Sequence, residues 1–297
     1  MPSAPDYAAP PMASDLAADL AFAVDLARGA GQVVARFYGH VERLTKTNSA
    51  STDEAVTEAD RATQRFIVQG LRGRYPGDGL VGEESDTGEA ITFECRDPMG
   101  RNWVIDPIDG TNNFIAGLGA FGVCIGLLDK GEPVLGVVYD VTRDAMYAAA
   151  RGHGAWLEEP RRLGGRHPIK APTDPLSPSS MVMLTSNLID KAGRCPQWAC
   201  HFLGQTTWKT RILGSAAIEA VQVAAGVAHA AFTVNGKLWD AVAPCAIVLE
   251  AGGAVTDLQG KPIWPFDLRG YQGAKVPFLA AGGAAHAELI EHVRRHP

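Results

Sequence analysis

The hydrophobic period of this chain changes near residue 79, and this change constrains the fold more than any other feature of the sequence. Before it, apolar side chains recur every three or four positions from Leu16 to Phe37, which is typical of a helix that buries one face. Ser14 stands before this run as a candidate N-cap, and Gly39 follows it as a stop signal. The first regular element we expect is therefore a long amphipathic helix.

A second helix is expected before the period changes. Thr57 and Asp60 stand three residues apart, as in a capping box, and the helix that they would begin runs to about Arg74. The turn-forming residues at 75–79 end it. Beyond this turn, short apolar runs are separated by Gly, Pro and Asp, and we expect them to be strands of one sheet with a hairpin across 129–132. These runs lie at 80–81, 103–105, 123–128, 134–139 and 145–150.

The segment 164–178 is dense in Pro and Gly and marks an expected boundary. Beyond it strands and helices alternate, which predicts a layered α/β arrangement. The expected strands are at 181–184, 230–234, 254–257 and 278–281, and the expected helices are at 215–225, 241–251 and 285–295. We therefore predict a disordered lead-in at 1–13, an N-terminal α+β region at 14–175 that carries most of the site, and a C-terminal α/β region at 176–297.

Composition and charge exclude some classes of partner. With 46% hydrophobic and 20% charged residues, the chain can bury a sizeable core, and its net charge of -6 leaves no basic surface for nucleic acid. No apolar run approaches the roughly 20 residues that a membrane helix needs. The N-terminus lacks the basic start and apolar centre of a signal peptide, and the five cysteines are scattered without zinc-site spacing. We therefore expect reduced cysteines and a cytoplasmic protein.

The segment WVIDPIDGT at 103–111 is the most informative for chemistry. An apolar strand leads into Asp106, which we expect at the end of that strand, and Asp109 follows within reach of a common point. Two such carboxylates repel each other unless a cation lies between them, which is what a site for a hard metal ion needs. Gly110 and Thr111 open a short helical turn whose free N–H groups suit a phosphate. Asp-Pro and Asp-Gly are also frequent turn dipeptides, and Asp109 taken alone could cap a helix.

Further acids follow apolar segments elsewhere, and each has a simple alternative explanation. Glu83 and Glu84 follow the expected strand at 80–81 and would suit a solvated turn. Asp240 precedes the helix expected at 241–251 and would serve as its N-cap. The capping box already explains Asp60. Their common order along the chain decides between these alternatives and a shared site.

That order closely resembles the inositol monophosphatase family. The matching segments are AVTEAD at 55–60, GEES at 82–85, DPIDGTNNF at 106–114, GVVYDVTRDAMYAAARGHGAW at 136–156, GSAA at 214–217 and WDAVAPCAIVLEAGG at 239–253. The resemblance covers nearly the whole chain, from about Ser14 to Arg295. It implies an α/β (α+β) fold arranged as a five-layered αβαβα sandwich, a homodimer, and Mg²⁺-dependent, Li⁺-sensitive phosphomonoesterase activity.

Carried over position by position, the resemblance implies the roles of individual residues. Two or three Mg²⁺ ions, with Mn²⁺ as an alternative, would be held by Glu83, Asp106, Asp109, Asp240 and the backbone carbonyl of Ile108. The phosphate would meet Gly110 and Thr111, and the organic part of the substrate would meet Gly214, Ser215, Ala216 and Asp240. Asp60 and Glu84 would be outer acids near the weaker metal. The catalytic residues would be Glu83, Thr111 and Asp106, with Glu83 and Thr111 orienting a metal-activated water.

The sequence departs from the family pattern at one position of the substrate site. The family carries an acid several residues before its Trp-Asp pair, whereas residues 231–238 contain none, and Thr233 and Asn235 stand there instead. A carboxylate that accepts hydrogen bonds from two hydroxyls is a large part of polyol recognition. The substrate therefore stays open among an inositol-1-phosphate-like polyol or sugar phosphate, histidinol phosphate and fructose 1,6-bisphosphate. A regulatory RNA-polymerase-associated factor of the same fold is the alternative that is not an enzyme, and the complete set of acids favours the enzyme.

Overall fold

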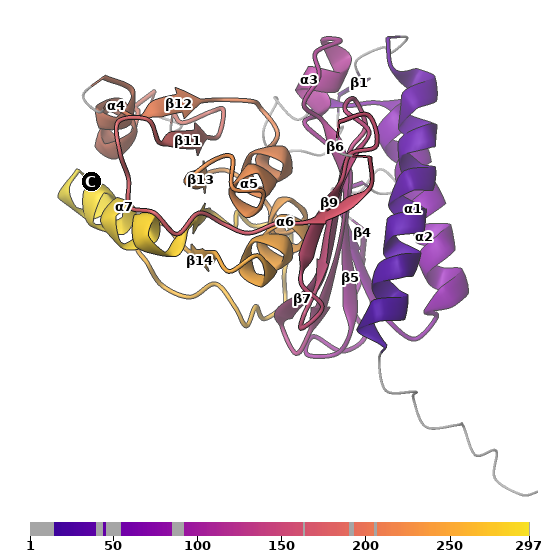
Figure 1. Ribbon diagram of the computed structural model, residues 1–297. Helices are drawn as coiled ribbons and strands as arrows, with labels where there is room; N and C mark the ends of the chain where they lie inside the picture. Colours follow the sequence, from indigo (N-terminus) through magenta and orange to yellow (C-terminus); the bar gives the residue numbers. More distant parts are fainter. Residues whose placement is uncertain are drawn as a thin grey trace, which may run out of the picture.

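A computed structural model of the chain describes residues 15–39, 44–45, 55–84, 92–162, 164–189, 193–204 and 207–296, and of 44–45 and 55–56 only the backbone. These residues form five layers, in the order helices, sheet, helices, sheet, helices (Figure 1). The αβαβα sandwich expected from the sequence is confirmed. The lead-in expected at 1–13 lies outside the described residues.

The first layer contains helices α1 (Leu16–Phe37) and α2 (Glu58–Arg74). The prediction that Ser14 caps α1 is wrong, because the carboxylate of Asp15 accepts the free N–H groups of Ala17 and Ala18 at 3.1 and 3.2 Å. The glycine stop is confirmed, since Gly39 has a left-handed φ of 85° just beyond the helix. The capping box of α2 is confirmed as well.

The second layer is an eight-stranded sheet in the order β10-β9-β8-β7-β6-β5-β3-β4, antiparallel except for the pair β3 and β5. Its strands are β3 (Gly79–Gly82), β4 (Thr92–Glu94), β5 (Asn102–Asp109), β6 (Gly122–Asp129), β7 (Glu132–Asp140), β8 (Ala145–Ala150), β9 (Ala155–Glu158) and β10 (Arg166–Pro168). The expected strands and the hairpin between β6 and β7 are confirmed. The expected strand end at Asp106 is wrong, because β5 continues to Asp109 through a shift of its register against β6. Three short elements lie near this sheet: β1 (Leu44–Thr45), β2 (Ala55–Val56) and α3 (Thr111–Ile115).

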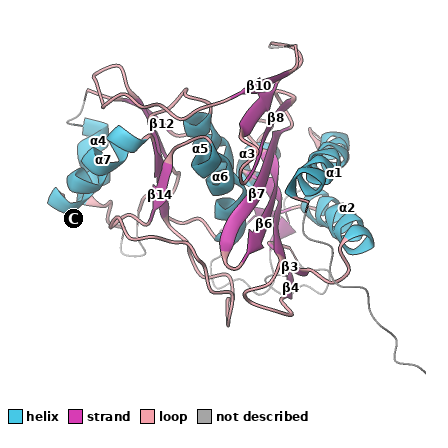
Figure 2. Cartoon of the chain, turned by 60° about the horizontal axis from the view of Figure 1, so that its bottom comes forward, coloured by secondary structure: helices cyan, strands magenta, loops and turns pink. Residues whose placement is uncertain are grey.

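The remaining layers come from the C-terminal part of the chain. Helices α5 (Ala216–Ala224) and α6 (Leu238–Glu250) lie between the two sheets, and α4 (Gln197–Gly204) and α7 (Gly283–Arg295) cover the outer face of the second sheet (Figure 2). That sheet has the order β12-β11-β13-β15-β14. Its strands are β11 (Met181–Leu184), β12 (Lys209–Arg211), β13 (Ala230–Thr233), β14 (Ala254–Thr256) and β15 (Phe278–Ala281). The sequence did not predict α4 or β12, which are short and weakly patterned, and the division near residue 175 stays a prediction.

Helix α6 packs unusually close to the first sheet at two glycines. A Cβ atom added to Gly136 would lie 2.0 Å from the backbone oxygen of Ala243, and one added to Gly126 would lie 2.6 Å from Cγ1 of Val242. Only residues without a side chain allow a strand and a helix backbone to approach in this way. The position of α6 relative to β6 and β7 is therefore fixed by direct backbone contact.

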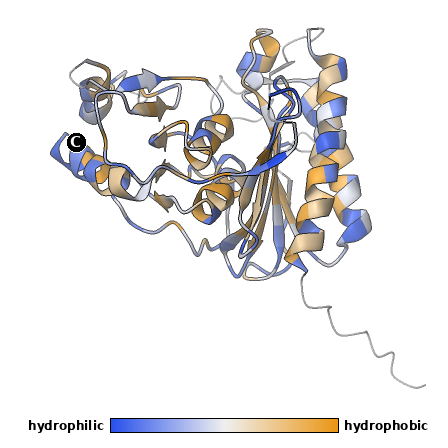
Figure 3. Cartoon of the chain, in the orientation of Figure 1, coloured by the Kyte–Doolittle hydropathy of each residue, from blue (hydrophilic) through white to orange (hydrophobic). Residues whose placement is uncertain are grey.

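Three buried apolar clusters fill the spaces between the layers. In β5, Trp103 and Ile105 face the cluster under α1 and α2, while Val104 faces the cluster around α5 and α6. Because helices cover both faces of this sheet, its strands are continuous apolar runs instead of alternating ones. Figure 3 shows this as hydrophobic colour along these strands and on α5 and α6.

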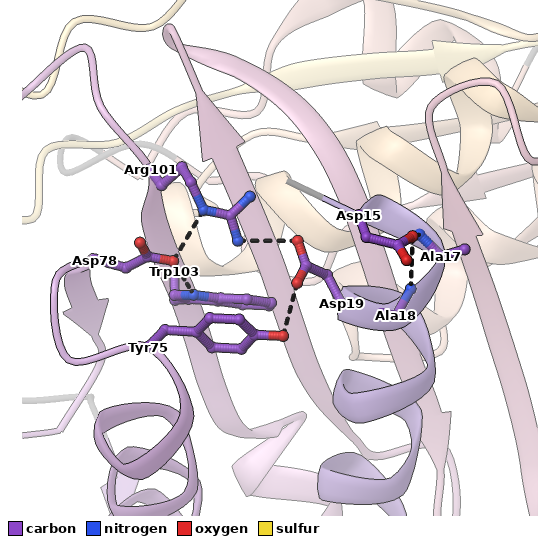
Figure 4. A network of polar contacts seen from close by, with 8 residues as sticks. All are labelled: Asp15, Ala17, Ala18, Asp19, Tyr75, Asp78, Arg101 and Trp103. Carbon is purple, nitrogen blue, oxygen red and sulfur yellow. Dashed lines mark hydrogen bonds and ion pairs between the residues drawn. The ribbon is translucent and has the colours of Figure 1, made fainter. Parts of the chain in front are cut away.

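A polar network fixes the start of β5, at the opposite end of the strand from Asp109 (Figure 4). Arg101 donates to Asp19 of α1 at 2.9 Å and to Asp78 of the α2–β3 turn at 3.1 Å. Tyr75 and the indole of Trp103 complete the network by donating to Asp19 and Asp78 at 2.7 and 2.9 Å. Burial and the neighbouring Asp19 raise the pKa of Tyr75, so its hydroxyl stays a donor. These bonds join the first layer to the strand that carries the site.

Two observations bear on the environment of the protein. The described part of the chain has no helix with the length and apolar character needed to span a bilayer. All five cysteines are free thiols, and Cys124 and Cys245 are buried.

Candidate active site

Three carboxylates from two distant parts of the chain meet at one point. Asp106 and Asp109 lie in β5 and Asp240 lies in α6, and one oxygen of each is within 4.8 Å of the others. Residues three apart in a regular strand point to opposite faces, so the register shift between Asp106 and Asp109 is what turns both toward the same side. We call Asp106, Asp109 and Asp240 the carboxylate cluster.

Asp240 reaches this point from inside the first turn of α6. The helix begins at Leu238 and Lys237 is its N-cap, so the prediction of a helix that starts at 241 with Asp240 as its cap is wrong. Asp240 Oδ2 instead accepts the backbone N–H of Lys237 at 2.5 Å. Its side chain also shares a hydrogen bond with that of Asp106.

The electrostatics of the cluster favour a bound cation. Burial raises the pKa of Asp106 well above its ordinary value, and the charges of Glu83, Asp109 and Asp240 raise it further. Burial raises the pKa of Asp109 to about 6 and, together with the charges of Asp109 and Glu83, that of Asp240 to about 8. The cluster therefore holds protons at neutral pH unless a positive ion takes their place. An all-oxygen donor set with several carboxylates fits Mg²⁺.

Asp109 is held by the start of α5. The hydroxyl of Ser215 donates to its Oδ2 at 2.5 Å, and the backbone N–H groups of Ala217 and Ala216 donate to the carboxylate at 2.7 and 3.3 Å. These bonds lower the pKa of Asp109 and partly oppose the effect of burial. The assignment of Ser215 and Ala216 to the substrate stays a prediction, and in the structure both bind a carboxylate of the cluster.

The loop before α5 is fixed by two residues that the sequence analysis missed. Glu219 is fully buried, and its Oε1 accepts the N–H groups of Leu213 and Gly214 at 2.6 and 3.0 Å. Asn113 of α3 donates to the carbonyl of Leu213 at 2.7 Å. Burial raises the pKa of Glu219 to about 8. An acid in an otherwise apolar helix, as in AAIEAVQVA, is the signal that could have identified it.

Thr111 connects β5 to α2. Its hydroxyl lies 2.9 Å from the carbonyl oxygen of Ile108 and 3.3 Å from Oδ1 of Asp60. The other oxygen of Asp60 accepts both the N–H and the hydroxyl of Thr57, at 2.7 and 2.6 Å. The capping-box acid is therefore also a member of the site. Because the hydroxyl hydrogen of Thr111 is directed at these acceptors, its oxygen remains able to accept a hydrogen bond from water.

Gly110 allows this turn to form. It has a φ of 91°, which favours glycine, and precedes α3 as its N-cap. A Cβ atom added there would lie 3.0 Å from the carbonyl oxygen of Ala120 and 3.1 Å from Cβ of Ser215. A side chain at this position would therefore disturb both the turn and the residue that holds Asp109.

Glu83 and Glu84 follow β3, where a glutamine of α2 fixes their backbone. Gln64 accepts the N–H of Glu84 at 2.9 Å and donates to its carbonyl oxygen, which also accepts the hydroxyl of Thr92 at 2.6 Å. Glu84 is buried, and Glu83 lies partly exposed and close enough to the carboxylate cluster to raise the pKa of each member. The sequence analysis missed Gln64, because one buried glutamine in an amphipathic helix has no local signature.

The two residues expected in place of the missing acid differ in position. Thr233 ends β13, is buried, and lies beside Asp240: a Cβ atom added to Gly236 would lie 2.5 Å from Cγ2 of Thr233 and 3.4 Å from Oδ2 of Asp240. The Asn235 side chain instead donates to the carbonyl of Asn187 and accepts from Nζ of Lys275 at 2.5 Å. The methyl group of Thr233 therefore lies near Asp240, and the Thr233 hydroxyl is buried without a hydrogen-bond partner among the described residues.

The family model that matches this chain is that of the inositol monophosphatase family, over residues 15–297. The inositol-1-monophosphatase of Bacillus subtilis is 31% identical over 74% of this chain and 79% of its own. The Nus factor SuhB of Pasteurella multocida is 36% identical over 81% and 85%, and the fructose-1,6-bisphosphatase/inositol-1-monophosphatase of Thermotoga maritima is 32% identical over 92% and 95%. The solved structure of a Thermotoga maritima IMPase has a TM-score of 0.76 at 29% identity, and the match covers 94% of this chain and 97% of that one.

Proposed function

The chain belongs to the inositol monophosphatase family, and from this we propose that it hydrolyses a small phosphate monoester with the help of Mg²⁺. The observation that carries the proposal is the carboxylate cluster, whose oxygens from β5 and α6 lie within 4.8 Å of one another. Such a cluster is unfavourable without a cation, because buried like charges repel. When bound, the metal ions would lower the pKa of a bound water and neutralise charge on the phosphoryl group.

We assign the metal to the cluster together with Glu83 and the carbonyl of Ile108. The raised pKa values of Asp109 and Asp240 mean that these groups release protons as the ions bind. Ser215 keeps Asp109 oriented, because its hydroxyl and the N–H groups at the start of α5 donate hydrogen bonds to the carboxylate.

The attacking water would be placed by Thr111 and Glu83. The hydroxyl oxygen of Thr111 accepts a hydrogen bond from this water, while the hydroxyl hydrogen is donated to Asp60 or to the carbonyl oxygen of Ile108. Glu83 would take the proton that the water loses as its oxygen attacks phosphorus, while the P–O bond to the alcohol breaks and the leaving alcohol oxygen takes a proton from solvent. In this assignment Asp60 orients Thr111, and it remains the outer acid proposed for the weaker metal, because a carboxylate offers about four lone-pair sites.

The alcohol part of the substrate would lie over Thr233 and Asp240. A threonine hydroxyl replaces a carboxylate poorly as an acceptor for vicinal hydroxyls, so we propose a site that accepts several polyol or sugar phosphates. An inositol-1-phosphate-like compound, histidinol phosphate and fructose 1,6-bisphosphate belong in the first panel of substrates. We also propose that the chain acts in the cytoplasm as a homodimer.

The test is release of inorganic phosphate from such a panel, with Mg²⁺ and with EDTA. We expect turnover only with Mg²⁺, and a loss of at least about a hundredfold in kcat for Asp109→Asn. The matched control is Asp174→Asn, which changes an exposed aspartate remote in sequence from the site motifs. Turnover by Asp109→Asn close to that of the control at saturating Mg²⁺ would refute the site assignment.

The 36% identity to the Nus factor SuhB of Pasteurella multocida favours a second candidate, a regulatory role alongside catalysis. The experiment is binding of purified RNA polymerase to the immobilised chain, comparing wild type with Asp109→Asn. Binding that survives the loss of phosphatase activity would support this role, and absence of binding by both proteins would contradict it.

A further inference from the structure

Three histidines gather on the outermost helical layer. His201 lies in α4, His292 lies in the last turn of α7, and His296 directly follows that helix. The ring centroids are 4.7 Å apart for His201 and His292, 4.2 Å for His201 and His296, and 4.7 Å for His292 and His296. This group lies on the other side of the second sheet from α6, which carries Asp240 (Figure 2). It is therefore separate from the carboxylate cluster.

The nitrogens of these rings lie close together, and one of them has no hydrogen-bond partner among the described residues. One ring nitrogen of each histidine lies within 4.8 Å of those of the other two. Nε2 of His292 is buried and has no hydrogen-bond partner among the described residues, which is an unfavourable state that water or an ion relieves in native proteins. Burial and the neighbouring His201 and His296 lower the pKa of His292 to about 4, so this ring is neutral and keeps its lone pair.

The surroundings keep one ring in place and leave room for further ligands. The ring of Phe202 stacks on His292 with centroids 4.4 Å apart. A surface hollow of about 410 Å³ opens beside the rings, and Glu288 and Glu291 are among the residues that line it. Arg295 is the nearby cation, and its guanidinium is paired with Glu291 at 2.9 Å.

We propose that His201, His292 and His296 bind one divalent transition-metal ion, of the class of Zn²⁺, Co²⁺, Ni²⁺ or Cu²⁺. Neutral imidazole is a preferred ligand of these ions, whereas Mg²⁺ prefers oxygen. His292 lies in the last turn of α7 and His296 is the C-cap of that helix, so both rings come from the same end of α7. The third histidine comes from another helix, so the ion joins α4 to α7. Water or Glu288 completes the coordination.

This inference does not depend on the proposed phosphatase activity and is tested without measuring it. The full chain is held in about 10 mM Mg²⁺, so that the carboxylate cluster is occupied by the ion that suits oxygen ligands. Zn²⁺ is then titrated by calorimetry and by competition with a coloured chelator, and Co²⁺ is followed by its visible spectrum. The variants are His201→Ala, His292→Ala and His296→Ala, and the control is His153→Ala, a histidine in an exposed turn.

We expect one Zn²⁺ per chain, and a loss of affinity of at least about tenfold for each of the three variants but not for the control. Zn²⁺ should also raise the Tm of wild type by a few degrees and should not do so for His296→Ala, whose change at the end of α7 leaves the core intact. Because His292 packs on Phe202, His201→Ala and His296→Ala remain informative if His292→Ala fails to fold. Zn²⁺ stoichiometry and affinity that are unchanged in both of these variants, or no binding at about 100 μM Zn²⁺, would overturn the proposal.

Discussion

Replacing Ser215 by alanine should move the pH range in which the protein binds Mg²⁺. The hydroxyl of Ser215 donates to Asp109 at 2.5 Å and lowers the pKa of that carboxyl, which burial otherwise raises. A hydrogen bond to a charged group contributes about 1.5–3 kcal/mol, and about 1.4 kcal/mol corresponds to one pKa unit. The Ser215→Ala change should therefore raise the pKa of Asp109 from about 6 to between about 7 and 8.

The consequence for metal binding follows from this shift. At pH 7 Asp109 is mostly ionised in wild type and would be half or more protonated in the variant, so the apparent Mg²⁺ affinity should fall about two- to tenfold. At pH 9 the carboxyl is ionised in both proteins. The difference in Mg²⁺ affinity should then be smaller, because only the orientation of Asp109 by Ser215 is lost. The assay is the Mg²⁺ dependence of phosphate release between pH 6 and 9.

The same substitution also removes the N-cap of α5, since Ser215 Oγ accepts the N–H of Ile218 at 3.2 Å. That loss destabilises the fold by about 1 kcal/mol. Asp15→Ala is the matched control, because it removes the N-cap of α1 and leaves the carboxylate cluster unchanged. Urea unfolding should show similar losses for both variants, while only Ser215→Ala shifts the Mg²⁺ titration. A folded Ser215→Ala protein with the wild-type Mg²⁺ midpoint at every pH would refute this account of Asp109.

Three further predictions concern pH, substrate choice and packing. In EDTA the free energy of unfolding should fall as pH rises from about 4 to about 8, because Asp109 and Asp240 bind protons more tightly in the folded protein than in the unfolded chain. Mg²⁺ should abolish this trend. Denaturant unfolding at several pH values, with EDTA and with Mg²⁺, checks both expectations. Thr233→Glu should raise kcat/KM for inositol 1-phosphate relative to glycerol 2-phosphate by about tenfold or more, because Thr233 lies near Asp240. Asn235→Glu should not, because Asn235 is bonded to Asn187 and Lys275; an equal ratio in both variants would argue against this. Gly136→Ala should destabilise the fold by about 3 kcal/mol, and wild-type unfolding of this variant would show that α6 can move away.

Apolar periodicity located the strands of the first sheet, and the segment 103–111 pointed to a metal site at Asp106 and Asp109. The five layers and the grouping of Asp240 with these two acids were expected from the resemblance to the inositol monophosphatase family, because the local pattern around Asp240 also suits a helix N-cap. The starting point of α6 was misplaced, because Asp240 suits either an N-cap or the first turn of a helix and only Lys237 distinguishes them.

The contacts that support the site could not be predicted from local signals. Gln64 binds the backbone of Glu84, twenty positions further along the chain, and Asn113 binds Leu213 at the far side of the site. Such bonds depend on tertiary packing and leave no pattern in the surrounding residues. Asp60 was explained by its capping box, and nothing nearby in sequence indicated that Thr111 shares its carboxylate.

The close approach of α6 to the first sheet has a consequence for genetics. Asp240 is carried by a helix whose place is set by Gly126 and Gly136, two residues that are not among the proposed metal or substrate residues. Substitutions there would displace Asp240 from Asp106 and Asp109 and abolish activity although every proposed metal-binding side chain is still present. A screen for inactive alleles should therefore recover these two glycines together with the acids, and an interpretation by chemistry alone would mistake them for members of the active site.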